Sequence, residues 1–492
     1  MNSPSTSTRL EHIQTNFTEI SFPRLLILLF VGSLLIHLIV VALFINQPIA
    51  LNDMFQYDML ARSLKEGKGF RWYSKADVEI LRPYYSQFLD IDNLHFPPEG
   101  LRTTFRAPGY PFFLAFLYLF VPDSLRFVLA RLAQAGLVSA LAPLTALLSH
   151  HTGFSRKVSI LSGIGISLYP ILLFYPIGLV SENLYILLGL SSLVAIIIVM
   201  KKKSLGWVLI AGLLCGMTML TRSIFAIYVL LAGGWISWSS PYKKKAGLLF
   251  LLVAFGLCLP WSIRNSLIIG RPAFIETSAG YQLFIGYHPE GDGGFVSRIA
   301  IKPMNILDDG ERDKICFQQA IAFIRQNPFE AVRRIFVRLV KFIGPEDREF
   351  FYFYSNNMMG AIPQPWISLI YSLLVIPWGS SLILGVAGLW LTKDRRIVKL
   401  IAIYLLGYGL PHLFIIAEPR FHLTWVPVLI PFAMHAWTSR KEIYCKVCQR
   451  DNIVFVGIII LIACIYAIGL VSNFPKLLLI MSPGGNELYL PY

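Results

Sequence analysis

Long apolar runs separated by short polar segments dominate the chain. A helix that crosses a membrane needs about 20 apolar residues. Eleven stretches approach that length: 24–45, 125–149, 157–177, 180–199, 205–221, 223–240, 246–264, 366–391, 397–416, 421–438 and 453–473. The run 111–121 is almost continuously apolar but too short, so we interpret it as a juxtamembrane or half-inserted helix. The pattern predicts an all-α polytopic membrane protein with about 11 transmembrane helices.

The composition agrees with a protein that spans a membrane several times. Hydrophobic residues make up 55% of the 492 residues and charged residues only 14%, against roughly 25% charged residues in a soluble domain. The first apolar run is longer than a signal-peptide core, and no A-x-A-like cleavage site follows it, so we interpret it as a retained anchor. The six scattered cysteines suggest no disulfide framework.

The net charge of +15 is distributed unevenly along the chain. If the N-terminus is cytoplasmic, the cytoplasmic segments hold most of the surplus of Lys and Arg: 1–24, 150–157, 201–204, 241–245, 393–399 and 439–450. The segments 46–107 and 270–365 then lie outside, and each carries equal numbers of acidic and basic residues. This is the positive-inside pattern of a cell-membrane protein. It explains the charge without a nucleic-acid partner.

The two long segments, 46–107 and 270–365, form the predicted outer loops. Loops of this length are usually functional. We interpret residues 1–492 as one integral membrane domain whose outer face is covered by these two loops.

The stretch "LNDMFQYDMLARSLKEGKGF", residues 51–70, begins the chemistry of the first outer loop. Its apolar spacing predicts a helix that ends near Gly67. Asp53 lies at the start of this helix, and Asp58 lies one and a half turns further on, on a different face. Two interpretations remain open from spacing alone. Asp53 is a helix cap and Asp58 a solvated residue, or one of these carboxylates takes part in a reaction.

Further polar residues fall at the predicted outer ends of the spans: Arg106, Arg131, Glu182, Arg222, Arg264, Asn265, Glu418, Arg420 and His422. Charged residues in such places are costly and tend to face a cavity or a partner, although a single arginine can instead extend to the lipid headgroups. Several arginines together suit a phosphate by charge and by forked hydrogen bonds. A neighbouring carboxylate suits a general base.

Several motifs in order resemble one family. Asp53, Tyr57, Ala61, Leu64 and Gly67 follow the spacing of its first outer loop. Six longer segments follow in order: "FRAPGYPFFLAFLYLF", "SLYPILLFYPIGLVSENLYILL", "GLLCGMTMLTRSIF", "PWSIRNSLIIGRPAFIETSAGYQLFIGYHPEGDGG", "AIAFIRQNPFEAVRRIFVRLVKF" and "EPRFHLTWVPVLIPF". Together they resemble the GT-C glycosyltransferases. The resemblance is to the superfamily of protein mannosyltransferases and aminoarabinose transferases, glycosyltransferase family 39-like. This chain departs from the pattern at Met54, where the family usually has a second acid, and at Ala107, where it has a proline.

The resemblance implies a GT-C fold and an inverting transfer of a hexose or pentose from a polyprenyl-phosphate donor. The acceptor would be a glycan, lipid or protein outside the cytoplasm. The spacing shared with the family makes Asp53 the candidate catalytic base. Arg106, Arg222, Arg264 and Arg420 are candidates for binding the donor phosphate, because they share the predicted outer location. Candidates for the rest of the substrate site are Asp58, Tyr57, Glu182, Asn265 and His422.

The sequence identifies no cofactor and no set of metal ligands. Some GT-C relatives use a divalent ion, but the departure at Met54 leaves a paired-acid metal site unsupported here. Two other functions stay open, a transporter or flippase of a lipid-linked saccharide and a polymerase or ligase of lipid-linked glycans.

Overall fold

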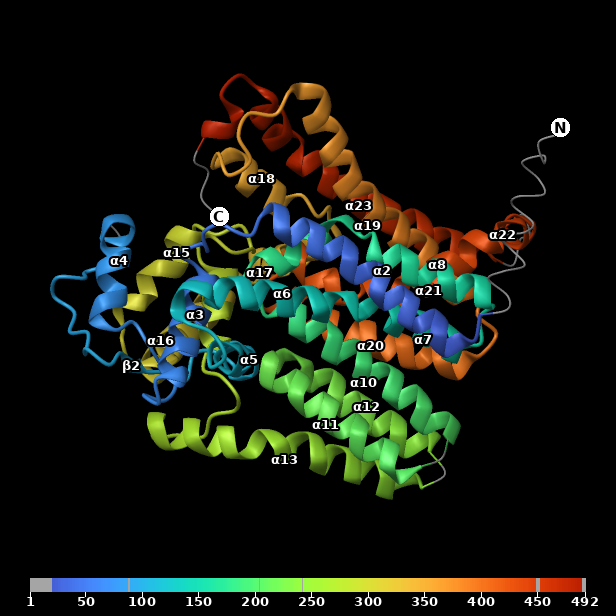
Figure 1. The fold of residues 1–492 in the computed structure, drawn as a ribbon, viewed down its shortest axis with the longest axis horizontal. Coiled ribbons are helices and arrows are strands. Elements are labelled where there is room, and N and C mark those ends of the chain that lie inside the picture. The colour runs from blue at the N-terminus through green and yellow to red at the C-terminus, as the bar shows by residue number, and fades with distance from the viewer. Residues whose placement is uncertain (1–19, 87–88, 203, 241, 448–451, 489–492) are drawn as a thin grey trace.

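The computed structural model describes residues 20–86, 89–202, 204–240, 242–447 and 452–488. Over this part of the chain the structure is almost entirely helical (Figure 1). Every one of the eleven apolar stretches falls on a helix or on consecutive helices. The prediction of an all-α protein with several membrane spans is therefore confirmed.

Seven helical segments in the described residues are long and apolar enough to cross a membrane. They are α2 (Phe22–Leu43), η1 with α6 and α7 (Asp123–Thr152), α10 (Glu182–Lys202), α13 (Lys243–Ile269), α19 (Gln364–Leu391), α20 (Arg395–Phe414) and α23 (Ile453–Met481). An eighth is a bent pair, α8 (Arg156–Ser167) followed by Pro170–Ile177. Four apolar helices are shorter: α5 (Gly109–Tyr118), α11 (Leu205–Thr221), η3 with α12 (Ser223–Ser239) and α21 (Val426–Thr438). Seven or eight spans are thus supported, and the number eleven stays a prediction.

The bent pair has a local cause in the sequence. Pro170 has no N–H and disfavours helical geometry at the residue before it. Tyr169 accordingly has an extended conformation, and the two helices meet at 51°. Carbonyl groups beyond the bend are bound by α6 (Arg126–Ser139): Arg131 donates to the carbonyl oxygen of Ile177 at 2.9 Å, and Gln134 donates to that of Gly178 at 3.0 Å. Arg131 therefore satisfies backbone groups inside the membrane domain.

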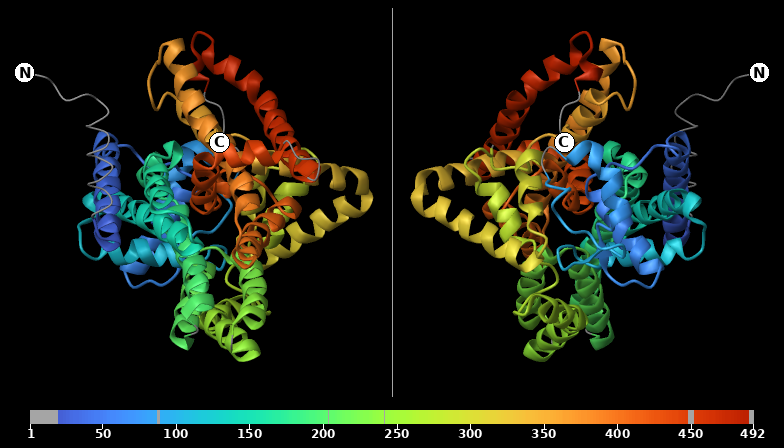
Figure 2. Two further views of the ribbon diagram at one scale, coloured as in Figure 1. Left: turned by 90° about the vertical axis from the view of Figure 1, so that its right-hand side faces the viewer. Right: turned by 90° about the vertical axis from the view of Figure 1, so that its left-hand side faces the viewer.

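The two long loops are folded into short helices at one end of the molecule. The first contains α3 (Asp53–Lys65), β1 (Arg71–Trp72), α4 (Lys75–Tyr85) and β2 (Leu101–Arg102). The second contains α14 (Ala279–Tyr287), α15 (Ser297–Ile301), η4 (Lys302–Asn305), α16 (Asp309–Gln326), α17 (Pro328–Ile343) and α18 (Arg348–Ser355). In Figure 1, α3, α4, α15 and α16 gather at the end opposite to α22 (Arg440–Val447). Seen along the long axis in Figure 2, α18 and α23 lie on one side and α11 to α13 on the other.

The two loops pack against each other. The Asp309 carboxylate accepts hydrogen bonds at 2.6 Å from the Thr103 hydroxyl and from the backbone N–H of Thr104. Thr104 in turn accepts from the backbone N–H of Thr277 at 2.9 Å. Aromatic and aliphatic side chains of both loops form one buried cluster that includes Phe105 and Tyr281. The strands β1 and β2 pair antiparallel through two residues each, a small departure from the all-α prediction.

Candidate active site

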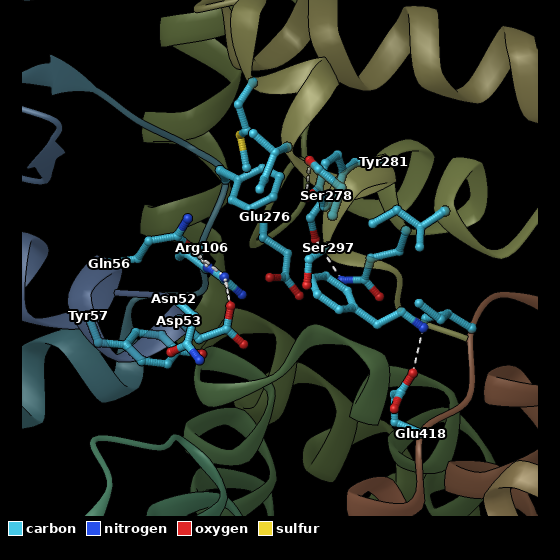
Figure 3. A pocket seen from close by; sticks show the side chains of 18 of the residues that line it. Asn52, Asp53, Gln56, Tyr57, Arg106, Glu276, Ser278, Tyr281, Ser297 and Glu418 are labelled. Atoms are coloured by element: carbon cyan, nitrogen blue, oxygen red, sulfur yellow. Dashed lines mark hydrogen bonds and ion pairs between the residues drawn. The ribbon is translucent and has the colours of Figure 1, made fainter. Parts of the chain in front are cut away.

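A cavity of about 920 Å³ lies where the two loops cover the helix ends (Figure 3). Its polar lining comes from both loops and from the ends of the membrane helices, and it includes Asp53, Gln56, Tyr57, Arg106, Arg222, Ser223, Glu276, Ser278, Gln282, Glu418 and Arg420. Its apolar lining includes Leu81, Ile224, Ile227, Met304, Pro411 and Ile415. The cavity is thus lined both by charged side chains and by apolar side chains, so a single ligand could contact both kinds.

Asp53 is the first residue of α3, and its side chain faces the cavity. Asn52 is the residue that caps the helix, because its side chain accepts from the Met54 N–H at 3.1 Å. The Asp53 carboxylate is left to accept from Arg106 at 2.5 Å through one oxygen and from Arg420 at 3.4 Å through the other. The interpretation of Asp53 as only a helix cap is therefore wrong.

The surroundings of Asp53 keep its carboxylate ionised. Burial acts to raise the pKa of this group, but the charges of Arg106 and Arg420 outweigh burial and lower the pKa from 3.8 to about 2. The side chain remains one-third exposed to the cavity, so a ligand can reach it.

Three arginines and two carboxylates form a continuous network around Asp53. Arg222 ends α11 and binds Glu182 at 2.6 Å, while its Nε donates to the Ser181 hydroxyl at 3.1 Å. Arg420, from η5 (Pro419–Thr424), joins the two carboxylates, since it lies 3.4 Å from Asp53 and 3.9 Å from Glu182. Segments more than 350 residues apart in the chain therefore meet at one point.

Close packing behind this network requires a glycine. A Cβ atom at Gly109 would lie 2.9 Å from the backbone oxygen of Leu220 and 2.7 Å from the Thr221 hydroxyl. The absence of a side chain lets the start of α5 approach the end of α11. Arg106 and Arg222, which precede and follow this contact in the chain, can thus reach the same cavity.

Two of the remaining predicted residues belong to this site. Tyr57 lines the cavity, and its hydroxyl donates to Ser181 at 3.3 Å. Glu182 lies behind Arg222, almost fully buried, at the first turn of α10. It positions arginines and does not line the cavity surface.

Asp58 lies away from the cavity and is completely buried. Its carboxylate accepts from Arg62 at 2.9 Å, from Arg126 at 2.9 Å and from the Tyr118 hydroxyl at 3.0 Å. It therefore ties α3 to α5 and α6, and the interpretation as a solvated residue is wrong.

Arg264 and Asn265, at the end of α13, also lie outside the cavity lining. Arg264 donates to the carbonyl oxygens of Thr103 at 2.7 Å and Phe70 at 3.3 Å, and it lies over the Trp261 ring. Asn265 donates to the carbonyl oxygen of Ile275 at 2.8 Å. The structure thus places both side chains on loop backbone, and it does not bring them to the other arginines.

His422 is fully buried on the far side of η5. Its Nδ1 lies 2.6 Å from the Phe342 carbonyl oxygen, its Nε2 lies 3.0 Å from Glu346, and its ring stacks on Trp378 at 3.9 Å. These contacts fix the segment that presents Arg420. His422 is therefore a positioning residue.

Several polar residues of the cavity were not anticipated from the sequence, among them Gln56, Ser223 and Glu276. Gln56 accepts from Arg106 Nε at 3.0 Å, and it lies three residues after Asp53, on the same face of α3. Ser223 directly follows Arg222 and donates to Glu276. Gln56 and Ser223 could have been found from their spacing to predicted residues, whereas Glu276 lies in an irregular segment in which no periodic spacing marks it. In the described part of the chain, no group of three or more His, Cys, Asp or Glu side chains is arranged to hold a metal ion.

Comparison of the sequence with known families and with characterised proteins gives no match. By structure, the chain is similar to the oligosaccharyltransferase AglB of the archaeon Archaeoglobus fulgidus in complex with an inhibitory peptide and a dolichol-phosphate (14% identity, TM-score 0.46, 95% of this chain and 56% of the other). It is similar to the same extent to the A. fulgidus enzyme with zinc and sulfate (14%, 0.46, 94% and 54%). The chain spans just over half the length of these structures. Similarity this distant assigns no activity, so the function must be inferred from the cavity itself.

Proposed function

We propose that the protein is a membrane glycosyltransferase of the GT-C type. It would move a hexose or pentose from a polyprenyl-phosphate donor to a glycan, lipid or protein acceptor, with inversion at the anomeric carbon. The chief support is a single observation: a carboxylate bound by two arginines opens onto a cavity that also has apolar walls. We further propose that the N-terminus is cytoplasmic and that the cavity lies on the extracytoplasmic side.

The charges of the network suit a monophosphate link between lipid and sugar. Arg106, Arg222 and Arg420 carry three positive charges against the two negative charges of Asp53 and Glu182. A sugar esterified to a polyprenyl phosphate carries one negative charge, which this surplus would balance. A diphosphate carries more negative charge than the network could neutralise, so a monophosphate donor is favoured.

The apolar wall offers a path for the lipid. Ile224 and Ile227 follow Arg222 in η3 and α12, and Pro411 and Ile415 face the cavity from the end of α20. Ile227 lines the cavity and is 44% exposed. A polyprenyl chain could thus lie in the bilayer beside Ile227 while its phosphate reaches Arg222.

The reaction needs one base and a stabilised leaving group. Asp53 would take the proton of the acceptor hydroxyl as its oxygen attacks the anomeric carbon from the face opposite to the phosphate. The bond between the anomeric carbon and the phosphate oxygen breaks, and its electron pair stays on the phosphate. The phosphate charge thus grows from one to two negative charges. The arginines would bind this dianion more strongly than the donor, which is the differential binding that accelerates a reaction.

Donor binding would also strengthen the base. The low pKa of Asp53 reflects the charges of Arg106 and Arg420. A bound phosphate would compete for these guanidinium groups and add its own negative charge, and both effects raise the pKa of a carboxylate. Asp53 would therefore become an effective proton acceptor only when the donor is in place.

The test compares cells that carry the wild-type protein with cells that carry Asp53→Asn. Mass spectrometry of their surface glycans, lipids and proteins should show one sugar missing from one class of molecule in the variant. Identical profiles, with both proteins present in the membrane at equal amounts, would contradict the proposal.

The arginine network predicts the effect of Arg420→Gln. Loss of a charge-assisted hydrogen bond costs about 1.5–3 kcal/mol, so the KM for the donor should rise about 10- to 100-fold. The donor KM of Arg420→Lys should lie between those of wild type and Arg420→Gln, because lysine keeps the positive charge but cannot form the paired hydrogen bonds of a guanidinium group. Arg298→Gln, on the exposed surface of the second loop, is the matched control. An unchanged donor KM in Arg420→Gln would exclude this arginine from phosphate binding.

The pKa of Asp53 predicts the acid side of the pH profile. A carboxylate whose pKa is lowered from 3.8 to about 2 stays ionised throughout the neutral and mildly acidic range. The stability that its ion pairs contribute is present above pH 3.8 and is lost as the pH falls toward 2. We therefore expect Asp53 to give no decline in kcat/KM, which reports the free enzyme, between pH 7 and 5. A decline in that range that moves to higher pH in Arg420→Gln, which loses a charge that lowers the pKa of Asp53, would contradict this assignment.

A further inference from the structure

Glu276 is a third carboxylate in the cavity besides Asp53 and Glu418, and it lies in the segment between α13 and α14. Figure 3 shows its side chain pointing into the cavity. The mechanism proposed above gives it no role. Two features of its surroundings matter: the backbone on both sides of it is hydrogen-bonded, and no arginine or lysine of the described residues forms an ion pair with it.

The backbone on both sides of Glu276 is held in place. The carbonyl oxygen of Ile275 accepts from the Asn265 side chain at 2.8 Å and from the Trp261 indole at 3.1 Å. The N–H of Thr277 donates to Thr104 at 2.9 Å, and the Thr277 hydroxyl lies 2.7 Å from that of Thr104. The side chains of Ile275 and Thr277 are buried. The segment thus fixes the direction in which Glu276 leaves the backbone.

The Glu276 carboxylate has no arginine or lysine within ion-pair distance among the described residues. Its one hydrogen bond from a side chain there comes from the Ser223 hydroxyl. The other carboxylates of the cavity each pair with an arginine. Asp53 pairs with Arg106, and Glu418 pairs with the guanidinium group of Arg348. Glu276 therefore keeps acceptor capacity that Asp53 and Glu418 use for guanidinium groups.

A fixed carboxylate without a cation is poorly suited to bind phosphate, because like charges repel. It is well suited to accept hydrogen bonds from hydroxyl groups, and charge-assisted bonds of this kind are about twice as strong as neutral ones. Ser278 and Gln282, at the start of α14, add neutral polar groups to the same wall. This wall therefore offers the pattern of groups that recognises a polyhydroxylated ring.

We infer that Glu276 recognises the sugar of the donor, by accepting hydrogen bonds from ring hydroxyl groups while the arginines hold the phosphate. This inference rests on the proposed function and adds to it a residue that decides which sugar is transferred. Trp261 and Asn265 would serve the same end by positioning the segment.

The test measures binding of farnesyl phosphate and of its glucosyl, mannosyl, galactosyl and arabinosyl esters to the purified full-length protein. Glu276→Gln should weaken binding of the preferred ester about tenfold or more and should not weaken binding of farnesyl phosphate. Glu276→Asp keeps the negative charge but shortens the side chain by one methylene group. This variant should change the order of preference among the esters. Glu290→Gln, an exposed residue of the same loop, is the matched control.

The outcomes separate this inference from the proposed function. If Glu276→Gln weakens farnesyl phosphate and its esters in parallel, Glu276 acts on the phosphate or on folding, and sugar recognition is excluded. If the preference among esters is unchanged while Asp53→Asn still abolishes transfer, the inference fails and the proposed function stands. If the wild-type protein binds neither farnesyl phosphate nor any ester, both fail. A deoxy analogue of the preferred sugar that binds wild type and Glu276→Gln equally well would identify the hydroxyl that is recognised.

Discussion

Asp53→Asn is expected to abolish sugar transfer in a protein that still folds and inserts into the membrane. Asparagine has nearly the same size and still accepts from Arg106, but it cannot take a proton from an acceptor. General-base assistance contributes about 10²- to 10⁴-fold to a rate, so kcat should fall by that factor. Removing a negative charge beside three arginines should at the same time leave donor binding intact or tighten it.

The combination of a lost kcat and an unweakened donor affinity is specific to a base. A residue that only organised the arginines would weaken donor binding when replaced. Glu66→Gln is the matched control, since Glu66 follows the same helix and its carboxylate pairs only with exposed Lys68 among the described residues. Measured transfer by Asp53→Asn within threefold of wild type would exclude Asp53 as the base.

Asp58→Ala is expected to destabilise the protein strongly. The change leaves Arg62 and Arg126 without their shared buried partner and removes an acceptor from Tyr118. Removing one member of a buried, hydrogen-bonded ion pair typically costs about 3–5 kcal/mol. The variant should therefore accumulate poorly and should unfold at a clearly lower temperature in detergent.

Asp92→Ala provides the comparison for Asp58→Ala. Asp92 also pairs with an arginine in the first loop, but its side chain is exposed, and exposed pairs contribute about 0–1 kcal/mol. The melting temperature of Asp92→Ala should stay close to that of wild type. If Asp58→Ala proved as stable as wild type yet inactive, Asp58 would be a substrate residue, as the sequence alone had suggested.

The helices of the membrane part could be predicted because apolar runs and short basic loops directly reflect the bilayer. The bend at Pro170 was also readable in principle, since proline excludes helix at the preceding residue. The number of spans could not be settled in this way. Helices such as α21, with 13 residues, are apolar enough for a membrane but too short to cross it alone.

The residues of the candidate site could likewise be predicted only in part. Asp53, Tyr57, Arg106, Arg222 and Arg420 were predicted together, and the structure brings them to one cavity. Arg264, Asn265 and His422 were predicted with them because they share the same level in the membrane. Sequence position fixes that level, but it does not fix the direction of a side chain, and these three turn toward backbone carbonyls or a buried glutamate. Glu276 escaped prediction because no periodic pattern marks a residue in an irregular segment.

Arg420 joins Asp53 to Glu182, and this pairing has a consequence for selectivity. The two carboxylates already bind the guanidinium groups, so an incoming anion has to replace them. Its net binding free energy is only the difference between the bonds that it forms and the bonds that it replaces. Small anions such as chloride or inorganic phosphate would gain little by that exchange. A polyprenyl phosphate also brings an apolar chain, whose contacts no small anion can match. Occupancy would then be decided by the lipid, and the site would stay closed to the salts of its surroundings.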